Sequence, residues 1–114
     1  MGNTTSAKPY DNLWVRGQNP WFNALFKFEE FEELVSKTLT ESVSEFENTM
    51  DKCYSYVFEN RDSFDRNFIK WDMLEEGIWP NDDELNALGT WDKHVEYTKE
   101  YLNNSLDYLI SQYY

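Results

Sequence analysis

The longest helical pattern in the chain lies in residues 46–71, FENTMDKCYSYVFENRDSFDRNFIKW. Its apolar side chains follow one another at spacings of three, four and seven residues. This spacing places them on one face of an α-helix, which has ~3.6 residues per turn. The stripe consists of Phe46, Met50, Cys53, Val57, Phe64, Phe68 and Trp71. We expect a bend near residues 60–63, and an end of the pattern at Gly77, with Pro80 as the stop signal beyond it.

Two helices are predicted before this segment. Asn19 is a favoured N-cap and Pro20 suits the first helical position, so a short helix should begin there and end near residues 27–28. A second helix should begin near Glu29, where acidic residues suit the helix dipole. We expect a break or kink near Thr40, because hydroxyl residues lower helix propensity there and the sequence SVSE at 42–45 fits a capping box. The alternative is one long helix that runs through residues 40–46.

A last helix is predicted after Thr90, which is a suitable N-cap. Its apolar stripe recurs at spacings of three and four residues and consists of Trp91, Val95, Thr98, Leu102, Leu106, Leu109 and Tyr113. Residues 77–89 read as a loop with an apolar anchor at residues 78–79. No strand alternation persists anywhere.

The fold class that follows is all-α, with three to four main helices in a small bundle. Residues 1–18 read as an irregular N-terminal arm, and residues 19–114 as the helical domain. We expect the aromatic residues on the stripes to form the core rather than a ligand platform. This expected core includes Trp21, Phe31, Phe46, Phe64, Phe68 and Trp71.

Composition excludes several functional classes. With 114 residues, 22 acidic and 10 basic side chains, the chain has a net charge of −12. This charge disfavours nucleic acid and an anionic membrane surface as partners. An aromatic content of 18% argues against a disordered acidic tail. No apolar run approaches the ~20 residues of a spanning helix, and no signal peptide is visible, so localisation stays unknown.

Few residues are candidates for chemistry. The glutamates at positions 29, 30, 32 and 33 could pair for acid–base work, but a helix start explains them more simply. The acidic run at 82–84 lacks the glycine and glutamate spacing of a calcium loop. The single histidine, His94, and the single cysteine, Cys53, are expected to be structural, the thiol buried on the stripe. No catalytic, cofactor-binding or metal-binding residue is therefore assigned.

The last helix carries tyrosines that its stripe does not use. Tyr97, Tyr101 and Tyr108 lie off the stripe, and Tyr114 follows it. Such side chains combine an apolar ring with a polar hydroxyl, which suits a wet protein interface. These four residues are the candidate partner-facing surface.

Several segments resemble one family in order and spacing. They are Pro20–Phe26 (PWFNALF) with Glu30-Phe31 and Leu34-Val35, Arg66–Trp71 (RNFIKW), Trp79-Pro80-Asn81, and Thr90–Tyr97 with Tyr101-Leu102 and Leu106–Leu109. Together they resemble the C-terminal helical region of the CotH spore-coat protein kinases, over roughly residues 20–110. The sequence departs from that pattern at Tyr101 and Tyr108, where tryptophan is usual, at Ser105, where arginine is usual, and around Leu39, where a tryptophan is common.

The resemblance implies a bacterial, spore-surface or extracellular kinase whose ATP and divalent-metal motifs lie upstream of the matched region. Asp11 lacks the glycine that follows the metal-binding aspartate of the family, so no catalytic role is carried onto it. We therefore expect a non-catalytic helical segment without cofactors of its own that supports an upstream kinase core or docks a partner. The alternative is a standalone helical protein–protein interaction module without kinase activity. Whether the chain has any enzyme activity is left open.

Overall fold

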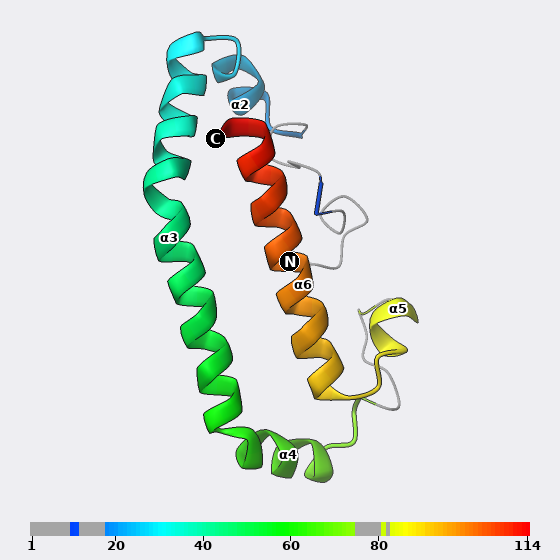
Figure 1. The fold of residues 1–114 in the computed structure, drawn as a ribbon. Coiled ribbons are helices and arrows are strands. Elements are labelled where there is room, and N and C mark those ends of the chain that lie inside the picture. Colours follow the sequence, from blue (N-terminus) through cyan, green and yellow to red (C-terminus); the bar gives the residue numbers. More distant parts are fainter. Residues whose placement is uncertain (1–9, 12–17, 75–80, 82) are drawn as a thin grey trace. The chain divides into compact units, whose positions relative to one another are not determined.

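The protein is helical throughout the part that the structure describes. In the computed structural model, residues 10–11, 18–74, 81 and 83–114 are described, and they contain five α-helices and no strand (Figure 1). Three of these helices have ten or more residues. The predicted all-α class is confirmed. Most of the predicted arm, like Gly77, Trp79 and Pro80, lies outside the described residues.

The short first helix begins where its capping signal predicts. Helix α2 spans Pro20–Leu25. The Asn19 side-chain oxygen accepts hydrogen bonds from the backbone N–H groups of Trp21 at 2.9 Å and Phe22 at 3.4 Å. These bonds satisfy donors that a helix start otherwise leaves unpaired. The chain then turns through Phe28, whose N–H donates to the Leu25 carbonyl at 3.0 Å.

Helix α3 spans Glu29–Glu59 without interruption, so the predicted break near Thr40 is wrong. The hydroxyl groups of Thr38 and Thr40 donate to the carbonyls of Leu34 and Ser36, each four residues back, at 2.8 and 2.9 Å. A hydroxyl that bonds back to the preceding turn no longer competes with the helix for backbone donors. The residues that lower helix propensity therefore fit inside the helix.

The predicted bend near residues 60–63 is confirmed as the junction between α3 and α4, which spans Arg61–Lys70. The Tyr56 carbonyl accepts from the Asn60 backbone N–H at 3.1 Å and from the Asn60 side-chain nitrogen at 2.8 Å, so Asn60 closes the last turn of α3. At the other end, the Trp71 N–H closes the last turn of α4 on the Asn67 carbonyl at 2.9 Å.

The segment predicted as a loop at residues 77–89 contains a short helix, α5, at Asp83–Asn86, which is a correction to the prediction. Its first turn carries Asp83 and Glu84, where the helix dipole stabilises negative charge. Helix α6 spans Trp91–Tyr113 and begins as predicted. The Thr90 hydroxyl oxygen accepts from the Lys93 N–H at 3.4 Å, which is the expected cap.

The chain divides into two compact units. Helices α3 and α6 each contribute residues to both units. The first unit comprises Met1–Glu45 and Tyr101–Tyr114. Its core is an aromatic cluster in which the Phe26 ring lies 5.1 Å from Phe31, edge to face, and 5.9 Å from Tyr113. The end of α6 therefore packs beside α2 and the beginning of α3 (Figure 1).

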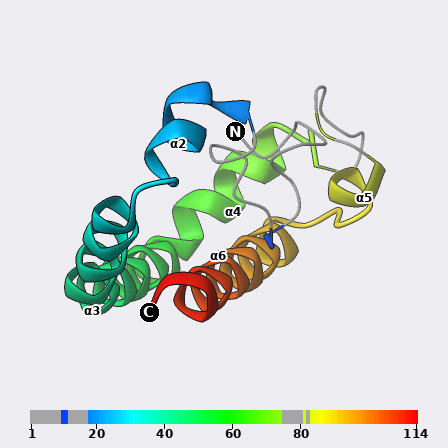
Figure 2. The same ribbon diagram turned by 90° about the horizontal axis from the view of Figure 1, so that it is seen from above.

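The second unit comprises Phe46–Glu100 and is built around Trp91. The Trp91 ring stacks on Phe64 at 5.5 Å, and its indole N–H donates to the Asp65 carboxylate at 2.7 Å. Within this unit, α4 follows α3 at an angle to it (Figures 1 and 2), and its first half contacts Trp91 at the beginning of α6. The arrangement holds α4 against the first turn of α6.

Burial is sparser than the helical stripes predict. Among the described residues, the buried apolar side chains are Met50, Trp91 and Leu106. Phe31, Phe64 and Phe68 are half-buried, but Trp21, Phe46 and Trp71 are exposed, which corrects the predicted core. The reason is that each helix packs against few neighbours, so a stripe finds cover along only part of its length.

Candidate functional site

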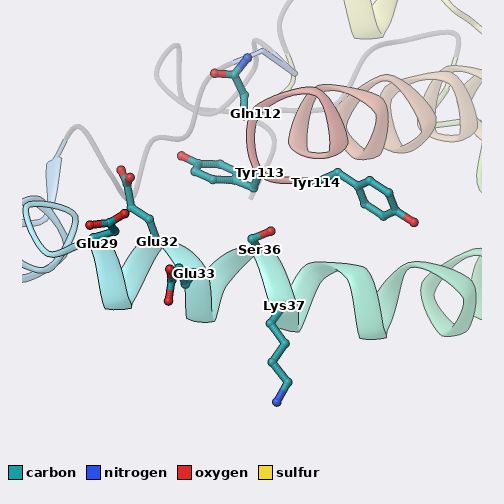
Figure 3. Close-up of a pocket in the computed structure, with 8 residues that line it drawn as sticks. All are labelled: Glu29, Glu32, Glu33, Ser36, Lys37, Gln112, Tyr113 and Tyr114. Carbon is teal, nitrogen blue, oxygen red and sulfur yellow. The ribbon is translucent and has the colours of Figure 1, made fainter.

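A pocket of about 580 Å³ lies in the first unit, between the beginning of α3 and the end of α6 (Figure 3). It is lined by Glu29, Glu32, Glu33, Ser36, Lys37, Gln112, Tyr113 and Tyr114. Figure 3 shows Tyr113 between the two helices and Glu32 directed toward it, whereas Lys37 points away. The lining is thus polar and acidic, unlike the largely apolar lining of most small-molecule sites.

The glutamates of this region sit where helix physics favours them. Four of the five residues at 29–33 are glutamate, and all four are exposed. Carboxylates in the first turn of a helix are stabilised by the positive end of its dipole. A catalytic pair of carboxylates would need an apolar surrounding, and this open, charged surface does not provide one.

A second feature of the first unit is an exposed apolar surface on α2. Phe22 in α2 and Phe26 directly after it join the aromatic cluster around Phe31. Trp21 and Leu25, four residues apart, share the adjacent face of α2 and are both exposed, Trp21 to 78%. Phe28, three residues after Leu25 in the turn that follows α2, is exposed too. We call Trp21, Leu25 and Phe28 the α2 patch.

The predicted tyrosine surface falls on two sides of α6. Tyr97, Tyr101 and Tyr108 share one helix face and are all half-buried, and neither Tyr97 nor Tyr101 is without a partner in the protein. Tyr114, directly after the helix, is exposed. Tyr97 belongs to the second unit, whereas the other three belong to the first. A partner-facing role for these four residues stays a prediction.

The single cysteine, Cys53, and the single histidine, His94, lie on different helices, α3 and α6. Cys53 is exposed, which corrects the predicted buried thiol. The buried face of α3 is centred on Met50, with Tyr54 and Val57 close to it around the helix, and Cys53 lies about 60° to the side of Met50. His94 is half-buried, as expected for a structural histidine. Within the described residues, no three His, Cys, Asp or Glu side chains gather to hold a metal ion.

The second unit contains a polar cluster around Trp91. The Arg61 guanidinium lies 5.0 Å from the centre of the Trp91 ring and pairs with Asp92 at 2.7 Å and with Asp65 at 3.8 Å. The contacts of Arg61 with Trp91 and Asp92 join α4 to the start of α6, and its pair with Asp65 lies within α4. The cluster therefore works as a structural clamp rather than as a binding site.

One buried polar atom stands out in the second unit. The Tyr54 hydroxyl is buried and has no hydrogen-bond partner in the described part of the chain. Burial raises the pKa of Tyr54, and the nearby Cys53 and Glu96 raise it further. Lys99 lies over the same ring at 5.3 Å from its centre. The ring is held in place by packing and by this cation, while its hydroxyl is unsatisfied.

The α2 patch is the feature that the sequence prediction missed. Trp21 was predicted in the core, Leu25 among the apolar residues of the same helix, and the end of that helix near residues 27–28. The signal was present in PWFNALFKF, residues 20–28, whose large apolar side chains at positions 21, 22, 25 and 26 spread over about 140° of the helix. A helix that packs on one side cannot bury such a sequence completely.

Comparisons with family models, with curated proteins and with solved structures found no match to this chain. In the described residues, no helix is both long enough and apolar enough to cross a membrane. The resemblance to the CotH kinases therefore rests on the quoted segments.

Proposed function

We propose that this chain is a non-catalytic helical element that binds another protein through exposed apolar side chains. One observation carries the proposal. Thirteen of the described large apolar or aromatic side chains are exposed, whereas three apolar side chains are buried. Exposed apolar surface on this scale is typical of protein interaction sites, and scattered single residues do not produce it.

The exposed residues are also grouped rather than isolated. Trp21, Leu25 and Phe28 lie within eight residues of the sequence in the first unit, and Ile69, Trp71 and Met73 lie within five residues in the second. Tryptophan and other aromatic residues contribute most to binding energy at protein interfaces. Groups of this kind support a role in binding.

The more specific proposal is that the partner is an upstream kinase core, as in the CotH-like proteins. It is supported by the four segments at positions 20–35, 66–71, 79–81 and 90–109 that resemble that family in order. In this arrangement, the chain would buttress the kinase core and could dock its substrate. The alternative, a standalone interaction module, is supported by the same exposed surface and differs in the partner.

The binding role can be tested with a neutral hydrophobic dye. Nile red added to the folded chain should gain fluorescence in proportion to exposed apolar surface, while circular dichroism and a cooperative melt show that the chain is folded. A folded chain that leaves the dye unchanged and sediments as a monomer would contradict the proposal. The dye must be neutral, because the net charge of −12 on the chain would repel an anionic dye.

The non-catalytic role can be tested separately. ATP binding and autophosphorylation should be absent with magnesium or manganese, and clear metal-dependent activity would contradict the non-catalytic role. The genomic sequence upstream of the Met1 codon distinguishes the kinase-core proposal from the standalone interaction module. An open reading frame that continues into kinase-like motifs supports the kinase core, and its absence supports the standalone module.

A further inference from the structure

We infer that the α2 patch is a docking surface for a basic amphipathic segment of a partner protein. This inference rests on the proposed function and names its site and the chemistry of its partner. Trp21, Leu25 and Phe28 supply the apolar contacts, and the glutamates at the start of α3 supply the charge.

The shape of the patch suits a helix or an extended segment with regularly spaced apolar residues. Trp21 and Leu25 are separated by one helical turn, and Phe28 follows Leu25 by three residues in the turn after α2. Short rows of apolar side chains at this spacing are what amphipathic segments recognise. Trp21 is also the kind of side chain that dominates binding energy when a partner covers it.

The charge beside the patch decides which partner fits. Glu29, Glu30 and Glu33 are exposed and follow Phe28 directly in the sequence. Lys27 is the nearby positive side chain in the sequence, so the segment that directly follows the patch is predominantly negative. A segment with lysine or arginine beside its apolar face complements both parts of this surface.

The same charge disfavours other occupants. A second copy would bring another cluster of glutamates and another net charge of −12 to the interface. Like charges placed together across an interface are costly, which makes self-association through this patch unfavourable. An anionic membrane surface is disfavoured for the same reason.

The patch can be altered without disturbing the fold. Trp21 and Phe28 are exposed, and alanine is a better helix former than tryptophan, so Trp21→Ala preserves α2. The aromatic cluster that holds α2 is made by Phe22, Phe26 and Phe31, which stay in place. Ile69→Ala is the matched control, because Ile69 is exposed to 81% but belongs to the second unit.

The experiment measures the fluorescence anisotropy of a labelled peptide with leucines at helical spacing and lysines elsewhere, titrated with the full chain. We expect binding that weakens about tenfold or more in Trp21→Ala and Phe28→Ala, as for interface hot spots. Ile69→Ala should bind as the unaltered chain does. The triple variant E29Q/E30Q/E33Q should bind several-fold more weakly, and its affinity should depend less on salt.

Three control ligands decide the alternatives. A peptide with glutamate in place of lysine should not bind, and neither should a lysine peptide with scrambled leucines. Tryptophan-dependent binding to neutral phosphatidylcholine vesicles would overturn the inference in favour of a membrane. A dimer in sedimentation that Trp21→Ala dissociates would overturn it in favour of a second copy.

The outcome separates this inference from the proposed function. If Nile red binds but the peptide does not, or if Trp21→Ala leaves the peptide affinity unchanged, the inference is wrong and the binding role is retained at another surface. If neither the dye nor the peptide binds, both are wrong.

Discussion

Trp21 and Trp91 occupy similar positions in the sequence, but one side chain is exposed and the other is buried. Each lies at the start of a helix, and each follows a capping side chain, Asn19 in one case and Thr90 in the other. Yet Trp21 is 78% exposed, whereas Trp91 is 9% exposed. The difference shows that a tryptophan at a helix start becomes a core residue only where a second helix brings partners to its ring.

The partners of Trp91 come from α4. Phe64 stacks on the ring, Arg61 lies over it, and Asp65 accepts the indole hydrogen bond. On α2, the phenylalanines face the aromatic cluster, and the tryptophan is left on the outer side. Trp91 therefore stabilises the second unit, and we propose that Trp21 of the first unit serves binding.

The largest expected effect comes from removing the buried ring. Trp91→Ala should lower the free energy of unfolding by about 3 kcal/mol, because it leaves a cavity and removes the indole hydrogen bond to the Asp65 carboxylate. The matched change Trp21→Ala should lower it by less than about 0.5 kcal/mol, as an exposed substitution does. Urea unfolding followed by circular dichroism measures both. Equal losses would remove the distinction between the two tryptophans.

A smaller effect should follow from loosening the clamp around Trp91. Arg61→Met removes the ion pairs to Asp92 and Asp65 and the cation over the ring, and should cost about 1 kcal/mol, since these groups are half exposed. Lys37→Met is the control, because the Lys37–Glu41 pair is 3.9 Å long and highly exposed. Its cost should be close to zero. High salt should shrink the difference between the Arg61 variant and the unaltered chain.

The smallest effect concerns the unsatisfied hydroxyl of the second unit. Tyr54→Phe should raise the free energy of unfolding by about 0.5 kcal/mol at neutral pH, because it removes a buried polar group that has no partner among the described residues. The exposed neighbour Tyr56→Phe should change it little.

The same residue predicts a pH dependence. The pKa of Tyr54 is raised above its ordinary value of 10.0, so the folded state holds this proton more tightly than the unfolded state. Stability should therefore fall as the pH rises above about 10 and through the raised pKa. In thermal melts across this pH range, the stability of the Tyr54→Phe variant should fall less steeply than that of the Tyr56→Phe variant. Parallel curves for the two variants would contradict the assignment.

Helix starts could be predicted from the sequence because local signals set them. Asn19, Glu29 and Thr90 mark the starts of α2, α3 and α6 within the residues that the structure describes. The continuity of α3 could not be predicted, because it depends on how the Thr38 and Thr40 hydroxyls bond back to the helix. Propensity alone gave the wrong answer there.

Burial was the least predictable property, because it depends on which helix packs against which. The period of the stripe placed Phe46, Cys53 and Trp71 on one face with Met50, but the structure buries only Met50 among these four. The same limit applies to the candidate site. The α2 patch consists of side chains that look like core in the sequence, and only their exposure identifies them as a surface.

Trp21→Ala tests the central claim most directly when one protein preparation is measured twice. Urea unfolding reports whether Trp21 stabilises the fold, and titration of the basic amphipathic peptide reports whether it binds. We predict a free energy of unfolding within about 0.5 kcal/mol of the unaltered chain and a peptide affinity weakened about tenfold or more. A loss of stability above about 1.5 kcal/mol with unchanged peptide affinity would show that Trp21 is a core residue and contradict the account.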